Sequence, residues 1–224
     1  MELKGKKINF IGDSITEGIG TSCQEAIYLN VLKEKAELSV VRNYGISGTR
    51  FALQKGVQTG KDPGMEYVDR NSFCERFDNM DNDADIVVVF GGTNDYGHGD
   101  ALLGEFSDRT PDTFYGACHY LFSGLIRKYL GKTIVIMTPL HRSNELLKNA
   151  NYKLEDYATL KEYVDIIREV AEYYSLPVLD LYKNSGIQPE IEEIKAMYMP
   201  DGVHPSNEGH LVIAHQLEMF LKCL

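Results

Sequence analysis

Short apolar runs alternate along the chain with longer segments in which apolar residues recur every three or four positions. The short runs favour β-strands, and the periodic segments favour α-helices. Five runs predict strands, at residues 7–11, 39–43, 85–90, 133–138 and 177–181. The run from Ile86 to Phe90 is apolar at every position, which is typical of a strand that helices cover on both faces of a parallel sheet.

The periodic segments predict helices at residues 24–37, 71–80, 111–129, 154–175 and 206–222. Within 154–175 the apolar side chains fall on one stripe, which consists of Leu160, Val164, Ile167, Ala171 and Tyr174. Pro111 suits the first turn of its helix, and Ser206 is the expected N-cap of the last one. That last helix is expected to bury Leu211, Ala214, Leu217 and Leu221.

The alternation of strands and helices indicates a doubly wound α/β fold. We expect a flavodoxin-like three-layer α/β/α sandwich with a five-stranded parallel sheet. The sequence contains no internal repeat, low-complexity segment or linker, so residues 1–224 are expected to form a single domain. Residues 91–110 have little periodicity and contain five glycines, so we expect a mobile loop over the acyl or alcohol side of a pocket. Whether this loop acts as a lid is left open.

Charge and composition narrow the range of partners. With 43% hydrophobic and 25% charged residues, the composition is that of an ordinary globular protein. The formal net charge of −10 disfavours nucleic acid and anionic membranes, which leaves a small molecule as the expected ligand. The N-terminal apolar stretch is too short for an export signal, and no run approaches the ~18 residues of a membrane span. We therefore expect a cytoplasmic protein, with a homo-oligomer as an open possibility.

The four cysteines, Cys23, Cys74, Cys118 and Cys223, form no Cys-x-x-Cys pair and match no zinc or disulfide spacing. We expect reduced thiols that pack as small hydrophobic side chains. The cysteines therefore predict no metal site.

Four short motifs either follow predicted strands or precede the last predicted helix. They are Gly12-Asp13-Ser14-Ile15-Thr16-Glu17, Asn43-Tyr44-Gly45-Ile46-Ser47-Gly48, Gly91-Gly92-Thr93-Asn94-Asp95 and Asp201-Gly202-Val203-His204-Pro205. All four can converge on one rim of the sheet, outside the carboxyl ends of its strands. The first lacks the second glycine of a Gly-x-Ser-x-Gly nucleophile elbow, which argues against an ordinary α/β-hydrolase.

The residue types in these motifs suit nucleophilic catalysis. A serine hydroxyl such as that of Ser14 needs an adjacent base, and an imidazole such as that of His204 titrates near working pH. A carboxylate on the far ring nitrogen fixes the tautomer and stabilises the imidazolium. Asp201 is close enough to His204 in sequence for one loop to present both side chains.

These motifs resemble those of the GDSL hydrolases, also called the SGNH family, over essentially the whole chain and in the expected order. The resemblance implies a catalytic Ser14, Asp201 and His204, with an oxyanion hole made by Ser14, Gly48 and Asn94. It also implies the SGNH hydrolase fold and two-step acyl transfer without a metal or organic cofactor. The chain departs from the family name in having Ile15 where the name has leucine, which is a swap between aliphatic residues.

The resemblance predicts a carboxylic ester hydrolase that acts on a small-molecule ester. The acidic chain without an apolar lid favours short acyl groups, such as acetyl esters of carbohydrates. The family also includes enzymes on thioesters and lysophospholipids, so a thioesterase or lysophospholipase on longer chains is an alternative. A non-catalytic binding protein with this fold is a further alternative, although it would be expected to lose part of the motif set.

Several polar residues near these motifs admit more than one interpretation. Asp13 is expected to accept hydrogen bonds from nearby loop N–H groups, although it can also line the pocket. Asp95 and His98 form a second Asp-x-x-His pair, which competes with Asp201 and His204 for the acid–base role. His98, His141 and Arg50 are candidates for contact with substrate.

Overall fold

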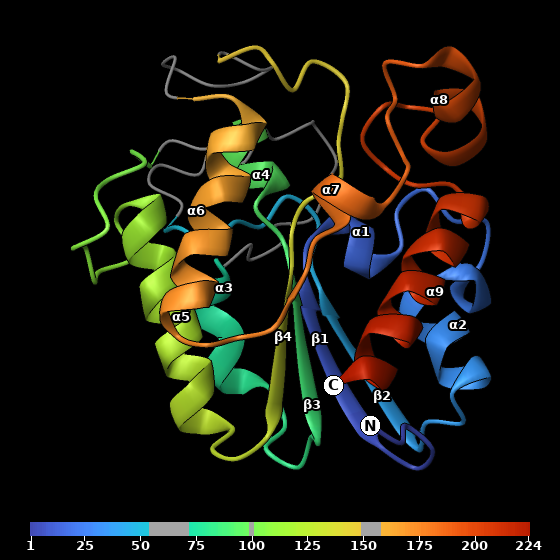
Figure 1. The fold of residues 1–224 in the computed structure, drawn as a ribbon, viewed down its shortest axis with the longest axis horizontal. Coiled ribbons are helices and arrows are strands. Elements are labelled where there is room, and N and C mark those ends of the chain that lie inside the picture. Colours follow the sequence, from blue (N-terminus) through green and yellow to red (C-terminus); the bar gives the residue numbers. More distant parts are fainter. Residues whose placement is uncertain (54–71, 99–100, 149–157) are drawn as a thin grey trace, which may run out of the picture.

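The five apolar runs form one parallel sheet, as the sequence predicts (Figure 1). The computed structural model describes residues 1–53, 72–98, 101–148 and 158–224. Within these residues the strands are β1 (Lys7–Gly12), β2 (Val40–Gly45), β3 (Ile86–Phe90), β4 (Thr133–Met137) and β5 (Val178–Leu179). They lie in the order β2-β1-β3-β4-β5. Strand β2 thus lies on one side of β1, and β3, β4 and β5 follow one another on the other side. The carboxyl ends of β1, β2 and β3 meet at one edge because all pairs are parallel and in register.

Helices cover both faces of the sheet, which gives the expected three layers (Figure 1). One face packs against α3 (Phe73–Arg76), α5 (Phe114–Lys128) and α6 (Leu160–Tyr173), and the other against α2 (Tyr28–Lys35) and α9 (Asn207–Cys223). Four short helices lie at the strand ends or beyond them, namely α1 (Ser14–Glu17), α4 (Thr93–His98), α7 (Leu181–Asn184) and α8 (Glu192–Tyr198). Two 3₁₀ turns cover Gln24–Ala26 and Phe77–Asn79.

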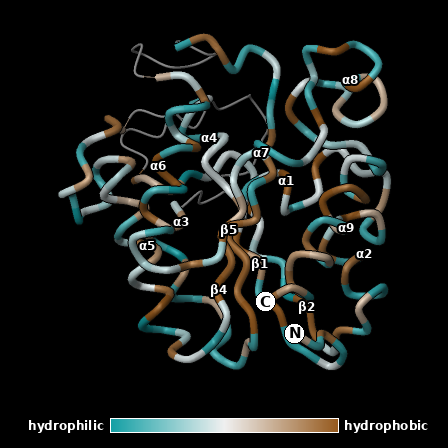
Figure 2. The backbone as a smooth tube through the Cα atoms, viewed as in Figure 1, coloured by the Kyte–Doolittle hydropathy of each residue, from teal (hydrophilic) through white to brown (hydrophobic). Residues whose placement is uncertain are grey.

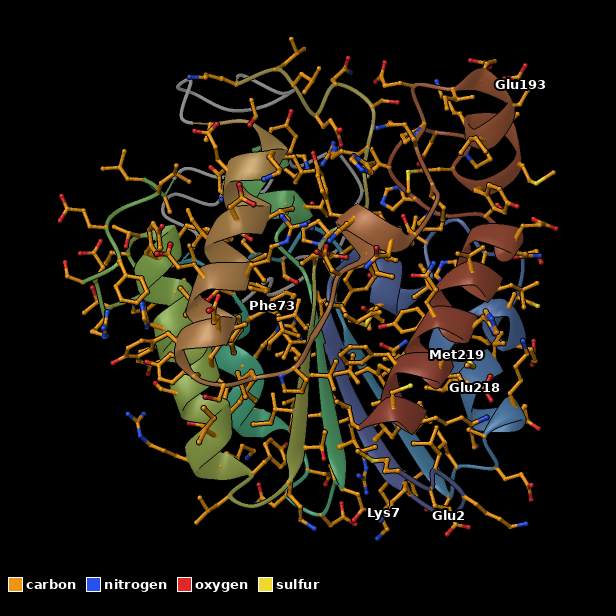
Figure 3. The ribbon with its side chains drawn as sticks, viewed as in Figure 1. Glu2, Lys7, Phe73, Glu193, Glu218 and Met219 are labelled. Atoms are coloured by element: carbon orange, nitrogen blue, oxygen red, sulfur yellow. The ribbon has the colours of Figure 1, made fainter. Side chains whose placement is uncertain are left out.

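The apolar strands divide the core into two clusters, one on each face of the sheet. In β3, Val87 and Val89 belong to the cluster under α5 and α6, whereas Ile86 and Val88 belong to the cluster under α2 and α9. This alternation explains why β3 is apolar at every position. Figure 2 shows the same feature as a hydrophobic centre inside more polar helices. Phe73 is fully buried on the α5 side, while Glu193 and Met219 lie on the outside of α8 and α9 (Figure 3).

Capping side chains decide where the long helices begin. Ser206 caps α9 by accepting a hydrogen bond from the Gly209 N–H, which confirms the predicted N-cap. Thr113 caps α5 in the same way, so Pro111 lies before the helix and its predicted place in the first turn is wrong. In α9 the predicted burial of Leu211 is also wrong, because 45% of this side chain is exposed and the buried stripe instead includes His210.

The predicted loop 91–110 is partly wrong. Thr93 to Gly97 are buried within α4, so this part of the segment is a packed helix at the end of β3. Residues 99–100 lie outside the described residues. Helices α1, α4, α7 and α8 were not predicted, because segments of four to seven residues are too short to show a helical period.

Two further predictions, on membrane-spanning segments and on the cysteines, can be compared with the structure. No helix among the described residues is long and apolar enough to cross a membrane. All four cysteines are free thiols, but only Cys74 and Cys118 are buried. The expectation that all four pack in the interior is therefore wrong for Cys23 and Cys223, which are exposed.

Candidate active site

The four sequence motifs meet at the carboxyl ends of β1, β2 and β3. Ser14 begins α1 directly after β1, Gly48 lies in the loop after β2, and Asn94 lies in α4 after β3. Asp201 and His204 lie in the loop before α9. His204 is 190 residues away from Ser14 in the sequence.

A continuous chain of hydrogen bonds joins the three candidate catalytic side chains. Ser14 Oγ lies 3.0 Å from His204 Nε2, and His204 Nδ1 lies 2.6 Å from Asp201 Oδ2. Burial alone would raise the pKa of Asp201, but hydrogen bonds from the ring and backbone of His204 and from the Val203 N–H lower it to about 2. Asp201 is therefore ionised at neutral pH and accepts a hydrogen bond from the Nδ1–H of His204. In the neutral imidazole, Nε2 then carries the lone pair that faces the Ser14 hydroxyl.

The Asp201–His204 turn is held by its own backbone and by the loop after β4. Asp201 Oδ1 accepts hydrogen bonds from the N–H groups of Val203, at 2.8 Å, and His204, at 2.7 Å. Gly202 has φ of +80°, a conformation that favours glycine, and its carbonyl accepts from the Ser143 N–H at 2.8 Å. A Cβ at Gly202 would lie 2.2 Å from Ser143 Oγ. The close approach of these two loops fixes the position of the imidazole.

Asp13 is buried at the start of the short helix that contains Ser14. Only 1% of Asp13 is exposed, and its carboxylate caps α1 by accepting from the Ile15 N–H at 3.0 Å. This is the structural role that the sequence analysis favours. Burial raises the pKa of Asp13 to about 6, although the Ile15 N–H and the nearby His204 lower it.

Gly48 and Asn94 lie on adjoining segments. Gly48 has φ of +76°, which allows the loop to turn after β2. Asn94 is 5% exposed, and its Nδ2 donates to the Thr49 carbonyl at 3.1 Å, which joins α4 to the loop that contains Gly48. This bond uses one of the two N–H donors of the amide.

Asp95, which the sequence analysis considers together with His98, binds the backbone of the loop after β2. It is 3% exposed, and its two carboxylate oxygens accept from the N–H groups of Phe51 and Ala52, each at 3.0 Å. Burial raises the pKa of Asp95 to about 6 despite these bonds. The carboxylate therefore anchors the loop after β2 to α4. His98 is half-buried at the end of α4.

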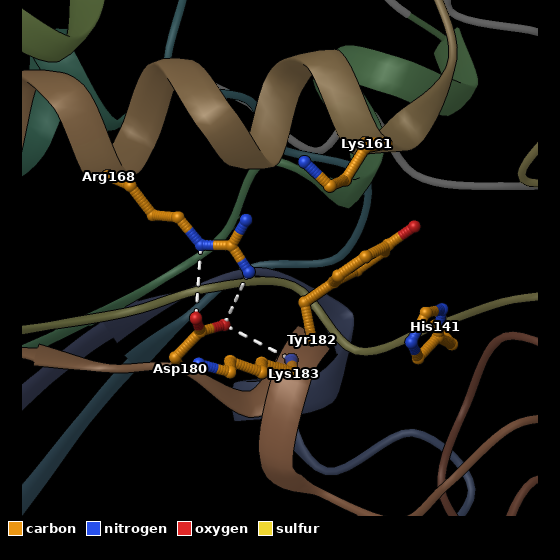
Figure 4. Close-up of a pocket in the computed structure, with 6 residues that line it drawn as sticks. All are labelled: His141, Lys161, Arg168, Asp180, Tyr182 and Lys183. Atoms are coloured by element: carbon orange, nitrogen blue, oxygen red, sulfur yellow. Dashed lines mark hydrogen bonds and ion pairs between the residues drawn. The ribbon is translucent and has the colours of Figure 1, made fainter.

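His141 lines a cleft at the carboxyl ends of β4 and β5 (Figure 4). The cleft has a volume of about 510 Å³ and is lined by His141, Lys161, Arg168, Asp180, Tyr182 and Lys183. His141 Nδ1 contacts both oxygens of the buried Glu145, at 2.8 and 2.9 Å. Arg168 forms two hydrogen bonds with Asp180, and Lys161 pairs with Asp165, so most of the charges here neutralise one another. None of Ser14, Asp201 and His204 lines this cleft.

Arg50 is half-buried two residues after Gly48, and its carbonyl accepts from the Phe73 N–H at 2.8 Å. This bond joins the loop after β2 to α3. The structure thus brings Ser14, Asp201 and His204 into direct contact, whereas His141 lines a cleft that none of these three residues lines.

Sequence reasoning missed two charged residues beside the site. Arg76 in α3 is 8% exposed, and its guanidinium donates to the carbonyls of Gly12 and Tyr44 at the ends of β1 and β2. Glu17, at the end of α1, accepts from Ser47. Neither residue has a signal in the sequence, because each acts on a segment 30 to 64 residues away.

A serine, an imidazole and a carboxylate that are linked in this order are the arrangement found in serine hydrolases. The sequence model of the GDSL-like lipase/acylhydrolase family matches residues 10–212, and the chain belongs to this family. The membership supports an ester-hydrolysing enzyme. No curated protein sequence matches the chain significantly. Within the described segments, no group of three His, Cys, Asp or Glu side chains is arranged to hold a metal ion.

Solved structures share the fold over nearly the full length of the chain. A protein from Lactobacillus plantarum is 29% identical, with a TM-score of 0.81, and the match covers 98% of each chain. A possible lipase from Chitinophaga pinensis DSM 2588 is 22% identical, with a TM-score of 0.69 and coverage of 97% of this chain and 98% of that one. A carbohydrate acetylesterase family member from Sinorhizobium meliloti is 18% identical, with a TM-score of 0.64 and the same coverage.

Proposed function

We propose that the protein is a serine esterase that cleaves carboxylic esters through an acyl-enzyme at Ser14. The observation that carries the proposal is the unbroken contact from Ser14 Oγ through the His204 ring to Asp201, at 3.0 and 2.6 Å. These distances lie within the range over which a base can take the proton of a nucleophile.

In the proposed reaction, Ser14 attacks the ester carbonyl while His204 Nε2 takes the hydroxyl proton. His204 then protonates the leaving alcohol. In the second half of the reaction, His204 takes a proton from the water that attacks the acyl group, and returns this proton to Ser14 Oγ as the acid is released. The ionised Asp201 stabilises the imidazolium at each step and keeps Nδ1 protonated. No metal or organic cofactor is needed for these steps.

The developing negative charge on the carbonyl oxygen needs hydrogen-bond donors that are already in place. We assign this role to the N–H groups of Ser14 and Gly48 and to the Asn94 amide. Asn94 supports the assignment because its other N–H is fixed by the Thr49 carbonyl, which orients the amide before substrate arrives.

For the substrate we propose a small-molecule ester with a short acyl group, such as an acetylated carbohydrate. The net charge of −10 disfavours anionic lipid surfaces, and a structural neighbour is described as a carbohydrate acetylesterase family member. A thioesterase or lysophospholipase acting on longer chains is the second candidate, because the family description includes both lipases and acylhydrolases.

Labelling with a fluorophosphonate probe tests the proposed nucleophile. We expect the folded wild-type protein and a Ser39→Ala control to be labelled at neutral pH, and Ser14→Ala to remain unlabelled. Absence of label on the folded wild-type protein would contradict the proposal. Hydrolysis of p-nitrophenyl esters of increasing chain length then separates the two substrate classes. A maximum at acetyl or butyryl supports short acyl groups, and a maximum beyond eight carbons favours the second candidate.

A further inference from the structure

The loop that contains Gly48 is attached to the helix that contains Ser14. Glu17 closes α1, and its Oε2 accepts hydrogen bonds from both the backbone N–H of Ser47, at 2.6 Å, and the Ser47 hydroxyl. Ser47 directly precedes Gly48. One carboxylate therefore links the end of α1 to Ser47, whose carbonyl group shares a peptide unit with the Gly48 N–H.

The same loop also forms hydrogen bonds with the buried Arg76 and with the end of β1. Arg76 Nη2 donates to the Gly12 carbonyl at 2.6 Å and to Thr49 Oγ1 at 3.1 Å, while the guanidinium lies 4.6 Å from the centre of the Phe73 ring. The Ile46 N–H also donates to the Gly12 carbonyl, at 3.1 Å. Residues 46–49 are thus fastened to the nucleophile turn before and after Gly48.

A glycine between these attachments has a physical consequence. Gly48 has φ of +76°, and glycine crosses φ and ψ space with little steric resistance, so the residue does not fix its own N–H direction. A donor in an oxyanion hole must lie about 2.7–3.1 Å from the oxygen in the transition state. The direction of the Gly48 N–H must therefore be set by its neighbours.

We infer that Glu17 is a positioning residue for the oxyanion hole, acting through Ser47 on the Gly48 N–H. This inference rests on the proposed function. Glu17 is exposed and belongs to a single helical turn, so it contributes little to the core. Glu17 forms two bonds with Ser47, the residue before Gly48. Loss of these bonds should change the direction of the Gly48 N–H, which weakens binding of the transition state more than binding of the substrate.

The test compares Glu17→Ala, Glu17→Gln and Ser47→Ala with Glu34→Ala, which removes an exposed glutamate from α2. We expect Glu17→Ala to lower kcat by about tenfold to a hundredfold, because small displacements of catalytic groups have effects of this size. Ser47→Ala should lower kcat by about threefold to tenfold, because the backbone N–H of residue 47 can still donate to Glu17. KM should change little, since the oxyanion exists only in the transition state. Glu17→Gln keeps one acceptor oxygen and should lie between Glu17→Ala and wild type.

Two further measurements separate positioning from a general structural role. The affinity for a trifluoromethyl ketone, which forms an oxyanion adduct with serine, should fall by the same factor as kcat/KM. The double variant Glu17→Ala/Ser47→Ala should be no slower than Glu17→Ala, because that single substitution already removes both bonds between the two residues. The melting temperature of each variant should stay close to that of Glu34→Ala.

A kcat for Glu17→Ala within about twofold of the control would overturn the inference. So would multiplicative effects in the double variant, or a rise in KM at unchanged kcat. If Glu17→Ala does not fold, Ser47→Ala and Glu17→Gln apply the same criteria. Failure of the proposed function is distinct, because the wild-type protein itself would then neither hydrolyse esters nor form the ketone adduct.

Discussion

The protonation states of individual side chains follow from their contacts. Asp201 has a pKa of about 2 and faces the imidazole, so it remains a carboxylate wherever the protein is expected to work. Asp13 and Asp95 are equally near the strand ends, but burial raises the pKa of each to about 6. Hydrogen bonding thus lowers the pKa of Asp201, whereas burial raises the pKa of the other two aspartates. Only Asp201 combines ionisation with contact to His204.

Asn94 provides the simplest test of the oxyanion hole at the residue scale. Asn94→Ala removes an uncharged side chain that belongs to neither cluster of the hydrophobic core, so the variant should fold. We expect kcat to fall roughly a hundredfold to a thousandfold, which is the usual effect of losing one such donor. Steady-state kinetics with a p-nitrophenyl ester measure the change, with the exposed Asn82→Ala as control. A kcat close to that of the control would exclude Asn94 from the oxyanion hole.

The sequence predicts residues whose chemistry is visible in their type and spacing, and misses those that act only through the fold. Ser14 and the Asp201–His204 pair could be proposed because hydroxyl, imidazole and carboxylate groups have known roles together. Arg76 could not, because its importance comes from carbonyls that lie 64 and 32 residues away in the chain. Glu17 is the last residue of a recognised motif, yet its partner Ser47 lies 30 residues further on.

At the scale of elements, the turn before α9 determines where His204, the proposed base, lies. Gly202 adopts φ of +80° against Ser143, whereas Gly131 adopts φ of +74° with open space around it. Alanine at either position should lower the free energy of unfolding by about 1–2 kcal/mol, because L-residues avoid this conformation. The two substitutions therefore cause similar backbone strain.

Only Gly202→Ala also places a Cβ 2.2 Å from Ser143 Oγ. We expect this variant to lose at least about tenfold in kcat through displacement of His204, and Gly131→Ala to keep its activity. Urea unfolding and kinetics of the two variants provide the measurement. Equal kcat values for both would show that the turn tolerates the change. The additional substitution Ser143→Gly should restore part of the lost activity.

The strands and long helices were predictable because each has a clear apolar period and buries a face. The short helices at the rim of the sheet were not predictable. Helix α4 was taken for part of a loop because Thr93, Asn94 and Asp95 are polar, although all three are buried. Their burial is possible because the loop after β2 satisfies the side chains of Asn94 and Asp95. A polar sequence that is buried by tertiary hydrogen bonds carries no hydrophobic period.

At the scale of the whole molecule, buried carboxyl groups link stability to pH. An aspartate in an unfolded chain has a pKa of about 3.9, and burial raises that of Asp95 to about 6. Between these values the folded protein binds more protons than the unfolded chain. The contribution of Asp95 to the free energy of unfolding therefore falls as the pH rises from about 4 to 6, and is constant above about pH 7.

Comparison of wild type with Asp95→Asn isolates this contribution, because the variant lacks the titrating group. We expect the stability of wild type relative to the variant to fall by on the order of 2 kcal/mol between pH 4 and pH 7. Urea unfolding at several pH values measures it, with the exposed Asp78→Asn as control. A relative stability that is independent of pH, or that rises with pH, would contradict this account.

The distance along the chain between Ser14 and His204 has a consequence for biosynthesis. A nascent chain on the ribosome already contains β1 and its serine long before the residues of the base have been translated. Helix α9 must then pack against α2, where His210 accepts from the Tyr28 N–H at 3.2 Å, before the imidazole can reach the hydroxyl. Under the proposed mechanism, Ser14 is an ordinary, unreactive alcohol throughout most of translation. The appearance of fluorophosphonate reactivity would report the moment at which the newly made chain completes its tertiary structure.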